Sequence, residues 1–463
     1  MTVDLVIRDA RIVTEDHIFR GSIAVRDGRI AALTSVGEEP AARRVVEADG
    51  RHLLPGLVDP HTHIGANRTR SWAELASSET KAAAAGGVTT VMQYCRNYGQ
   101  RDGSYLDGFD DYVATGRSQI HVDLFFHFTL ESDAQIAEIP TYAQRYGIRC
   151  FKAYIGGYPP GNEIGLGILD TAQMVDAMRQ VQLLGNGGLL AVHVEDVAVV
   201  GRGMRDTAAS RRQDLPAYTE ARPAEAEESD LLRAAYWAKV TGCRLYVPHV
   251  TIGNALDLAA RARLERGPEL VLETCPQYLV LTKDAPIGIR GKCNPPLRDQ
   301  REQDRLWEGI RRGLISTIGT DHVSSTKGQR GNDLWTEIPG FAGLETLLPL
   351  LVTEGVRKGR IEWTDIVRLC SANPARTFGI YPRKGSLLPG ADADLVLVDD
   401  QTERVVSQER MHTVGTTVYA GQKLSGWPWM TIVRGVPVYE GDRVTAPAGH
   451  GSILNLSASG VAR

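Results

Sequence analysis

Short apolar, β-rich runs recur along the middle of this chain, and each ends in a polar side chain that precedes a Gly-rich or polar stretch. A run of this kind is typical of a buried parallel strand, and the carboxyl ends of parallel strands meet at one edge of a sheet. We therefore expect the side chains at these strand ends to converge on one mouth. They are His61, His63, Lys152, His193, His249 and Asp321.

The first two of these side chains belong to the segment GLVDPHTH. Residues i and i+2 of a strand face the same side, so the rings of His61 and His63 would project together, as a shared metal ion requires. An isolated HxH pair also occurs as two surface histidines at a strand end. A lone His after an apolar run is commonly a core residue, and a lone Lys commonly a surface residue. The metal site is predicted by the six residues together.

Helical patterns alternate with the apolar runs from Leu53 to about Lys384, for example SWAELASSETKAAAA and ESDLLRAAYWAKVTG. Alternating strands and helices over this length predict an α/β fold, a (β/α)8 TIM-like barrel, whose active sites lie at the carboxyl ends of the strands. The polar stretch from Gly201 to Glu228 is either a helical excursion over the mouth or a flexible lid.

Both ends of the chain show the alternation of antiparallel strands instead. Segments such as DLVIRDARIV and GSIAVRDGRIAAL precede the barrel, and ADADLVLVDD and MTIVRGVPVYEGDRV follow it. We predict one small β-sandwich domain formed from residues 1–52 and 385–447. The barrel would span residues 53–384, and residues 448–463 would form a C-terminal tail.

Composition excludes several other classes of protein. The 463 residues carry a net charge of only −4 with scattered basic residues, which supports neither nucleic-acid binding nor attraction to a membrane. No apolar stretch approaches the roughly 18 residues that span a bilayer, and the N-terminus lacks a secretory apolar core, so a cytoplasmic location is expected. The six cysteines include no CxxC pair, so we expect reduced thiols rather than a disulfide framework or a thiolate zinc site.

A series of motifs runs in order along nearly the whole chain: PGLVDPHTH, GGVTT, FKAY, VHVED, RPAEAEE, ETCPQYL, CNPPLRD, GTDH, NPARTFGIYPRKG, GADADLVL and TIVRG. In these motifs the chain resembles the cyclic amidohydrolases of the hydantoinase, dihydropyrimidinase and allantoinase group, within the amidohydrolase superfamily. The order of the motifs is highly specific for the family and much less so for the substrate.

The resemblance implies two divalent metal ions per chain, bridged by a carboxylated Lys152 (N6-carboxylysine). The ligands of the buried ion would be His61, His63 and Asp321, and those of the more exposed ion His193 and His249. A bare ammonium cannot bind a metal, whereas addition of CO2 to the neutral amine gives a two-oxygen anion, and burial favours the neutral amine. Histidine and carboxylate ligands suit Zn2+, although Mn2+ or Co2+ could occupy the same site.

The resemblance also implies a mechanism. Two ions that share a water make hydroxide available near neutral pH and polarise the scissile carbonyl. Asp321 would accept the proton during the attack and deliver it to the leaving ring nitrogen.

Substrate recognition in relatives depends on a tyrosine after the bridging lysine and on two stretches of backbone. Tyr154 and Tyr158 follow the lysine at +2 and +6, whereas hydantoinases usually place theirs at +5. We favour Tyr158 as the donor to the oxyanion, the alternative being an aromatic wall residue. The backbone positions that clamp the ring would be Asn294 in CNPPLRD and Gly340 in IPGFAG.

The residues directly after the HxH pair narrow the substrate class. Dihydroorotases commonly carry an arginine there to bind the substrate carboxylate, and this chain has Ile64-Gly65, so an anionic ring is disfavoured. With Tyr94 and Tyr98, Ile64 suggests an apolar pocket that accepts aromatic groups, which favours hydantoins with bulky 5-substituents. The expected reaction opens a neutral ring, a hydantoin or dihydropyrimidine, to an N-carbamoyl amino acid. The alternatives are an allantoinase, a cyclic imide hydrolase, or a noncatalytic dihydropyrimidinase-like scaffold. A homotetramer or homodimer is expected from the family.

Overall fold

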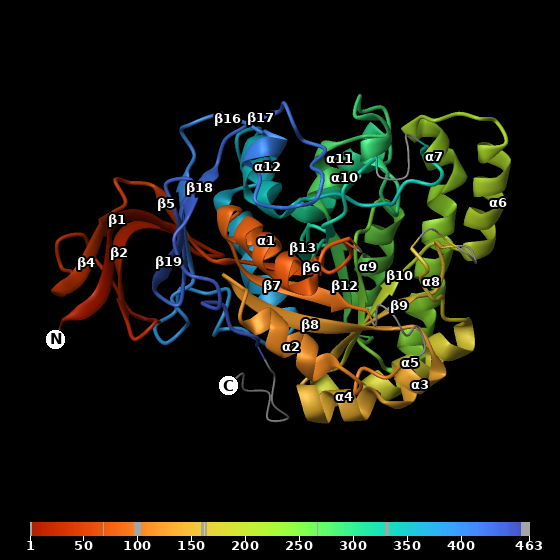
Figure 1. The fold of residues 1–463 in the computed structure, drawn as a ribbon, viewed down its shortest axis with the longest axis horizontal. Helices are drawn as coiled ribbons and strands as arrows, with labels where there is room; N and C mark the ends of the chain where they lie inside the picture. Colours follow the sequence, from red (N-terminus) through yellow and green to blue (C-terminus); the bar gives the residue numbers. More distant parts are fainter. Residues whose placement is uncertain are drawn as a thin grey trace.

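The computed structural model describes residues 2–67, 69–96, 103–158, 162, 164–265, 267–328 and 333–454. Figure 1 shows two parts, a large barrel and a smaller β domain beside the chain's N-terminus. This is the predicted fold class, a TIM-like barrel with a separate β-sandwich domain built from both ends of the chain.

The barrel is a closed parallel sheet in which sequence neighbours pair in order from β6 to β13. Its strands are β6 (Leu57–His63), β7 (Val88–Cys95), β8 (Asp123–Leu130), β9 (Cys150–Tyr154), β10 (Leu189–His193), β11 (Leu245–Val247), β12 (Leu270–Thr274), β13 (Thr317–Ile318) and β14 (His322–Val323). The two shortest strands share the eighth position, because β13 pairs with β12 while β14 pairs with β6. Asp321 lies in the interruption between them, where the barrel closes.

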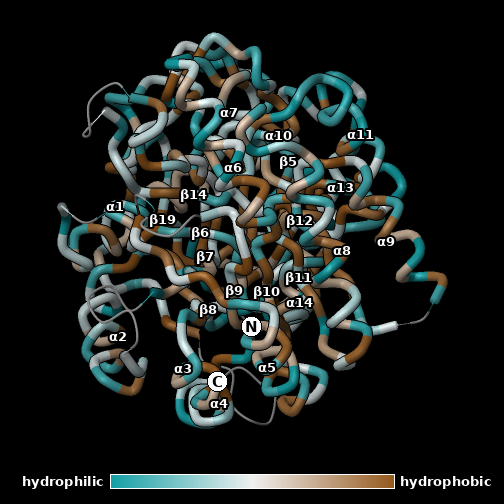
Figure 2. Tube along the Cα trace, turned by 90° about the vertical axis from the view of Figure 1, so that its right-hand side faces the viewer, coloured by the Kyte–Doolittle hydropathy of each residue, from teal (hydrophilic) through white to brown (hydrophobic). Residues whose placement is uncertain are grey.

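Helices surround this sheet, as Figure 2 shows with the strands in the middle and α1, α2, α5 and α9 towards the rim. The helices between barrel strands are α1 (Trp72–Ala85), α2 (Phe109–Arg117), α3 (Asp133–Ala137), α4 (Ile139–Tyr146), α5 (Thr171–Gln182), α6 (Val197–Ala208), α7 (Leu215–Ala221), α8 (Ala224–Thr241), α9 (Asn254–Leu264), α10 (Pro276–Val280) and α11 (Gln300–Arg311). After β14 follow α12 (Leu347–Leu350), α13 (Trp363–Val367) and α14 (Asn373–Thr377). Several of these helices begin at capping boxes, in which the N-cap residue and the third helical residue exchange hydrogen bonds. Ser71 and Glu74 form one at α1, and Asp170 and Gln173 form another at α5.

The stretch from Gly201 to Glu228 is helical. It contains most of α6, all of α7 and the start of α8, so of the two alternatives the structure has the helical excursion. None of the helices in the described part of the chain combines the length and apolar character that crossing a membrane requires.

The β domain is one sheet in which strands from the two ends of the chain lie side by side, in the order β20-β19-β18-β15-β5-β1-β2-β3, with β4 paired to β1. Its N-terminal strands are β1 (Val3–Val13), β2 (Ile18–Arg26), β3 (Arg29–Thr34), β4 (Ala42–Glu47) and β5 (His52–Pro55), and its C-terminal strands are β15 (Leu395–Asp399), β18 (Trp427–Val433), β19 (Val436–Glu440) and β20 (Arg443–Val444). The two ends join where β15 pairs with β5. A separate hairpin is formed by β16 (Arg404–Val405) and β17 (Lys423–Leu424).

The chain returns to the barrel after the β domain. Ile453 forms a parallel bridge to Leu124 at the start of β8, and Leu454 is buried in the apolar cluster at that end of the barrel. The described part of the predicted tail, residues 448–454, therefore packs on its own barrel. The six cysteines are all buried thiols without a disulfide partner, as expected.

Candidate metal centre

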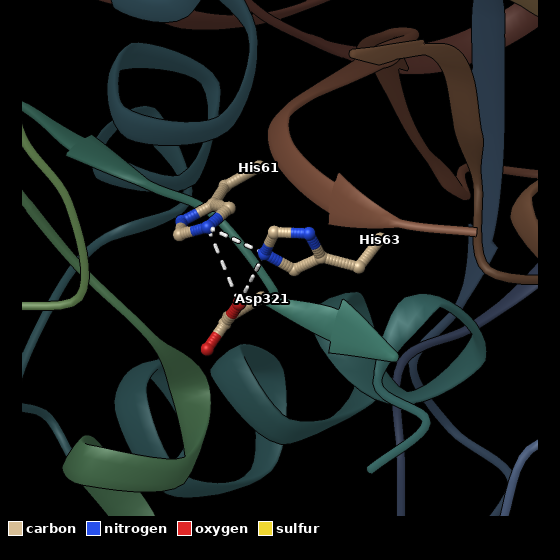
Figure 3. A group of neighbouring side chains, drawn as sticks. All are labelled: His61, His63 and Asp321. Atoms are coloured by element: carbon tan, nitrogen blue, oxygen red, sulfur yellow. Dashed lines mark hydrogen bonds and ion pairs between the residues drawn. The ribbon is translucent and has the colours of Figure 1, made fainter. Parts of the chain in front are cut away.

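Three of the predicted ligands form a compact cluster at the carboxyl end of the barrel. The Nε2 atoms of His61 and His63 lie 3.2 Å apart, and each is 3.2 Å from Oδ1 of Asp321. Figure 3 shows the two imidazoles and the carboxylate converging. A triangle with such edges suits one ion at the roughly 2.0–2.2 Å typical of nitrogen and oxygen ligands.

A second cluster is formed by the other two histidines. His193 ends β10 and His249 follows β11, and Nδ1 of the first lies 2.9 Å from Nε2 of the second. The two clusters adjoin, since the rings of His61 and His249 are 5.3 Å apart between centroids. His249 and Asp321 both adopt a positive φ, of 46° and 51°, which is uncommon outside glycine and frequent at functional sites.

Lys152 lies within electrostatic range of both clusters. It is fully buried on β9, and its Nζ has no hydrogen-bond partner among the described residues. The ring centroids of Tyr94 and Tyr154 lie 5.2 and 5.0 Å from Nζ. Burial lowers the pKa of Lys152 to about 8, against the opposing effect of Asp321. A substantial fraction of this amine is therefore neutral near physiological pH, which is the state that reacts with CO2.

Two buried acidic side chains each contact one ring nitrogen of a histidine and leave the other nitrogen facing a cluster. Glu273 lies 2.7 Å from Nδ1 of His61 and leaves its Nε2 towards the first cluster. Glu195 lies 3.0 Å from Nε2 of His193 and leaves its Nδ1 towards the second. Such carboxylate–histidine pairs orient metal ligands. Glu273 also accepts a hydrogen bond from the backbone N–H of His249, at 3.1 Å, so it contacts both clusters.

A cavity of about 300 Å3 opens above the two clusters. Of the ten predicted site residues, the eight that line it are His63, Tyr154, Tyr158, His193, His249, Asn294, Asp321 and Gly340. The other two, His61 and Lys152, lie beneath its floor and are fully buried. The structure thus brings the predicted set together in one place, while the roles of its members stay predictions.

Both candidate tyrosines face this cavity. The rings of Tyr154 and Tyr158 lie 5.2 and 5.4 Å from that of His193, and both side chains are buried. Between the two tyrosines, Gly156 and Gly157 pack closely against the end of β10. A Cβ at Gly156 would lie 1.8 Å from the carbonyl oxygen of Glu195, and a Cβ at Gly157 would lie 2.4 Å from Nε2 of His193. This close packing lies in the segment that places Tyr158 at the unusual +6 spacing. The geometry leaves both tyrosines as candidates.

The two backbone positions predicted to clamp the ring are connected. Gly340 donates its backbone N–H to the carbonyl of Lys292, two residues before Asn294, at 2.9 Å. Gly340 has a φ of 89°, and a Cβ there would lie 2.3 Å from Val323, so only glycine fits without displacement.

The apolar wall of the cavity differs from the one expected from sequence. Ile64 and Tyr94 are fully buried away from the cavity lining, Tyr94 packing against His61, and Tyr98 lies outside the described residues. The wall is formed instead by Ile164, Leu166, Val323 and Ile338. Most of these side chains come from loops after β9 and β14, whose direction a strand pattern does not predict.

Comparison with known proteins places this geometry in a family. Residues 280–438 match the Amidohydrolase family. The chain is 32% identical to a D-hydantoinase of Streptomyces coelicolor over 98% of both chains, and 33% identical to an allantoinase of Rubrobacter xylanophilus over 96% of both. The chain belongs to the cyclic amidohydrolases. The solved L-hydantoinase (dihydropyrimidinase) from Arthrobacter aurescens superposes with a TM-score of 0.90 at 28% identity, over 98% of this chain and 100% of that one.

Membership among the cyclic amidohydrolases implies a site for two divalent metal ions, and the residues present fit such a site. The two clusters supply imidazole and carboxylate donors in separate groups, and the unpartnered Nζ of Lys152 is a buried polar atom that metal-bridging as a carbamate would satisfy.

Sequence reasoning missed the residues behind the ligands. Glu195, Arg222 and Glu273 belong to the motifs VHVED, RPAEAEE and ETCPQYL, which were recognised without a role for these side chains. Burial alone would raise the pKa of Glu195, but Arg222 and His193 outweigh it and hold that pKa at about 2. For Glu195 and Glu273 the available signal was a charged residue in a family motif beside an apolar strand, whereas Arg222 follows a helix and lacked that signal.

Proposed function

We propose that this cyclic amidohydrolase opens the amide bond of a neutral ring, a hydantoin or dihydropyrimidine, to give an N-carbamoyl amino acid. The observation that carries the proposal is the arrangement of two ligand clusters around buried Lys152 at the floor of one cavity. The similarity to hydantoinases over nearly the whole chain supports it.

We propose zinc as the metal and a carboxylated Lys152 as the bridge. The first cluster would hold one ion and the second cluster the other, with Mn2+ or Co2+ able to replace Zn2+. When bound, the two ions supply hydroxide near neutral pH and polarise the scissile carbonyl.

Asp321 is proposed as the proton carrier. Its Oδ1 lies towards the two histidines, while its other carboxylate oxygen points away from both rings (Figure 3). Asp321 also lines the cavity, so this Oδ2 can take the proton released during the attack and pass it to the leaving ring nitrogen. An amide nitrogen is a poor leaving group until it is protonated, which makes this transfer part of the reaction.

Tyr158 is proposed as the hydrogen-bond donor to the oxyanion. It lines the cavity beside His193, and its phenol would stabilise the charge that develops on the attacked carbonyl. Tyr154 is the alternative, since it meets the same two conditions.

The charges around the cavity support a neutral substrate. Arg96 lines the cavity, but its Nη2 lies 2.7 Å from Oε1 of the buried Glu131 and it also donates to the carbonyls of Ile164 and Gly165. Its charge is thus balanced within the protein, so it is a weak counter-ion for an anionic ring.

Allantoin hydrolysis is the second candidate, because the allantoinase relative is as similar as the hydantoinase relative. A panel of hydantoin, 5-phenylhydantoin, dihydrouracil, allantoin and phthalimide, assayed with zinc-loaded protein, separates these activities. We expect the fastest turnover with a hydantoin or dihydrouracil. Fastest turnover of allantoin or phthalimide would reassign the substrate, and no turnover by protein with two ions per chain would favour the noncatalytic scaffold.

We propose a homodimer or homotetramer as the state of assembly. Exposed apolar side chains recur one helical turn apart along α8, at Leu232, Tyr236 and Val240, and such a stripe is a candidate contact surface. Light scattering tests the assembly, and a monomer at micromolar concentration would contradict it.

A further inference from the structure

The ion pair between Glu195 and Arg222 lies directly behind the second ligand cluster. Glu195 follows β10 and Arg222 follows α7, and both side chains are almost completely buried, at 0% and 2% exposed. Arg222 binds both carboxylate oxygens, with Nε donating to Oε1 at 3.1 Å and Nη2 donating to Oε2. A two-point bond of this kind fixes the direction of the carboxylate as well as its charge.

One of the two carboxylate oxygens that Arg222 binds, Oε2, also contacts His193. Oε2 of Glu195 lies 3.0 Å from Nε2 of the imidazole. A neutral imidazole carries one N–H, and a carboxylate can only accept, so the proton lies on Nε2 and the lone pair on Nδ1 faces His249. The opposite tautomer would place a proton between the two histidines, where an ion would have to bind.

The first cluster is arranged the other way round. His61 contacts Glu273 through Nδ1 and presents Nε2, whereas His193 contacts Glu195 through Nε2 and presents Nδ1. Each of the two histidines thus contacts its own buried acidic side chain. Of these two acidic side chains, Glu195 is the one paired with a guanidinium among the described residues, so the Glu195–Arg222 pair belongs to the second cluster, whereas Glu273 contacts both.

Gly157 covers the contact between Glu195 and His193. A Cβ at Gly157 would lie 2.4 Å from Nε2 of His193 and 3.0 Å from Oε2 of Glu195. The backbone at this point is therefore packed directly against the contact between Nε2 and the carboxylate. Arg222 also lies 5.8 Å from the ring of Tyr158, on the cavity side of the same group.

We propose that Glu195 and Arg222 are positioning residues that set the tautomer of His193, so that its Nδ1 is free to bind the second metal ion. This inference rests on the two-ion centre of the proposed function. If so, the affinity of the second cluster for its ion depends on Glu195 and Arg222, although neither residue is one of the proposed ligands.

The test is metal binding rather than turnover. Zinc-loaded wild type, Glu195→Gln, Arg222→Lys and Arg222→Met are titrated with a competing chelator, and zinc per chain is followed. We expect two release steps in the wild type. Glu195→Gln and Arg222→Met should weaken the more labile step by about 10- to 100-fold, the range typical of a lost partner behind a metal ligand, and leave the tighter step within about threefold. Arg222→Lys keeps the charge but loses the fork, so its shift should be intermediate.

Lys384→Met serves as a matched control, because Lys384 is equally buried and paired with Asp123 and Asp394 but lies at the junction with the β domain. It should lower the unfolding temperature without separating the two zinc steps. Equal weakening of both steps in Glu195→Gln and Arg222→Lys, or no change in either, would overturn the proposal. A wild type that binds fewer than two ions would instead refute the two-ion centre, whatever the variants do.

Discussion

Gly157 gives a sharp test of how closely the chain packs over His193. Its φ is 79°, and a Cβ there would lie 2.4 Å from the imidazole Nε2. Gly157→Ala therefore has two costs, roughly 1–2 kcal/mol for the left-handed backbone and about 1–3 kcal/mol for forcing an extra methyl group into a packed site. The sum is about 2–5 kcal/mol. Because the imidazole must move, the second metal ion should also be lost.

Gly185→Ala is the control for the backbone cost. Gly185 lies in the same barrel with a φ of 73°, and a Cβ there meets no described atom within 4 Å. It should lose only the roughly 1–2 kcal/mol of the backbone term and keep its metal. Urea unfolding of the metal-free proteins and zinc analysis of the loaded ones measure both effects. Equal stability losses in the two variants, with full zinc in Gly157→Ala, would refute the packing argument.

Substitutions at three further positions test the proposed roles directly. Lys152→Ala should abolish hydrolysis and regain part of it when a short carboxylate is added with metal, whereas Lys152→Arg should gain nothing, because guanidinium stays protonated. Since the pKa of Lys152 is about 8, the neutral amine increases as pH rises from about 7 to about 9, and reactivation of metal-free protein by zinc at a constant concentration of dissolved CO2 should accelerate over that range; a flat profile would contradict this. Asp321→Asn should lower kcat by about 10² to 10⁴ while much of the metal remains, and wild-type kcat would exclude Asp321 as the proton carrier. Tyr158→Phe should lower kcat by about 10² to 10³, and an unchanged rate would transfer the role to Tyr154 or to neither tyrosine.

The sequence was most informative where a periodic pattern and a chemical constraint coincided. The barrel and the convergence of the candidate ligands followed from apolar runs that end in histidine, lysine or aspartate, because parallel strands must bring their carboxyl ends together. The joining of the two chain ends in one β domain followed from matching alternation, and β15 pairs with β5 as that requires.

The cavity wall and the residues behind the ligands could not be derived in the same way. Ile164 and Ile338 reach the cavity from irregular loops, and Ile64 turned inward, because the path of a loop depends on packing rather than on periodicity. Glu195 and Arg222 lie 27 positions apart in sequence and meet only through the folding of α6 and α7. A single sequence does not show which charged residues of a motif will pair.

The two-ion centre bridged by Lys152 is the central claim, and a crystal structure of the active zinc enzyme with anomalous scattering measured at the zinc edge tests it most directly. The account predicts two zinc peaks per chain, one at His61, His63 and Asp321 and the other at His193 and His249, with carbamate density on Nζ of Lys152 between them. One peak or none in fully active protein, or an unmodified lysine between two ions, would contradict it.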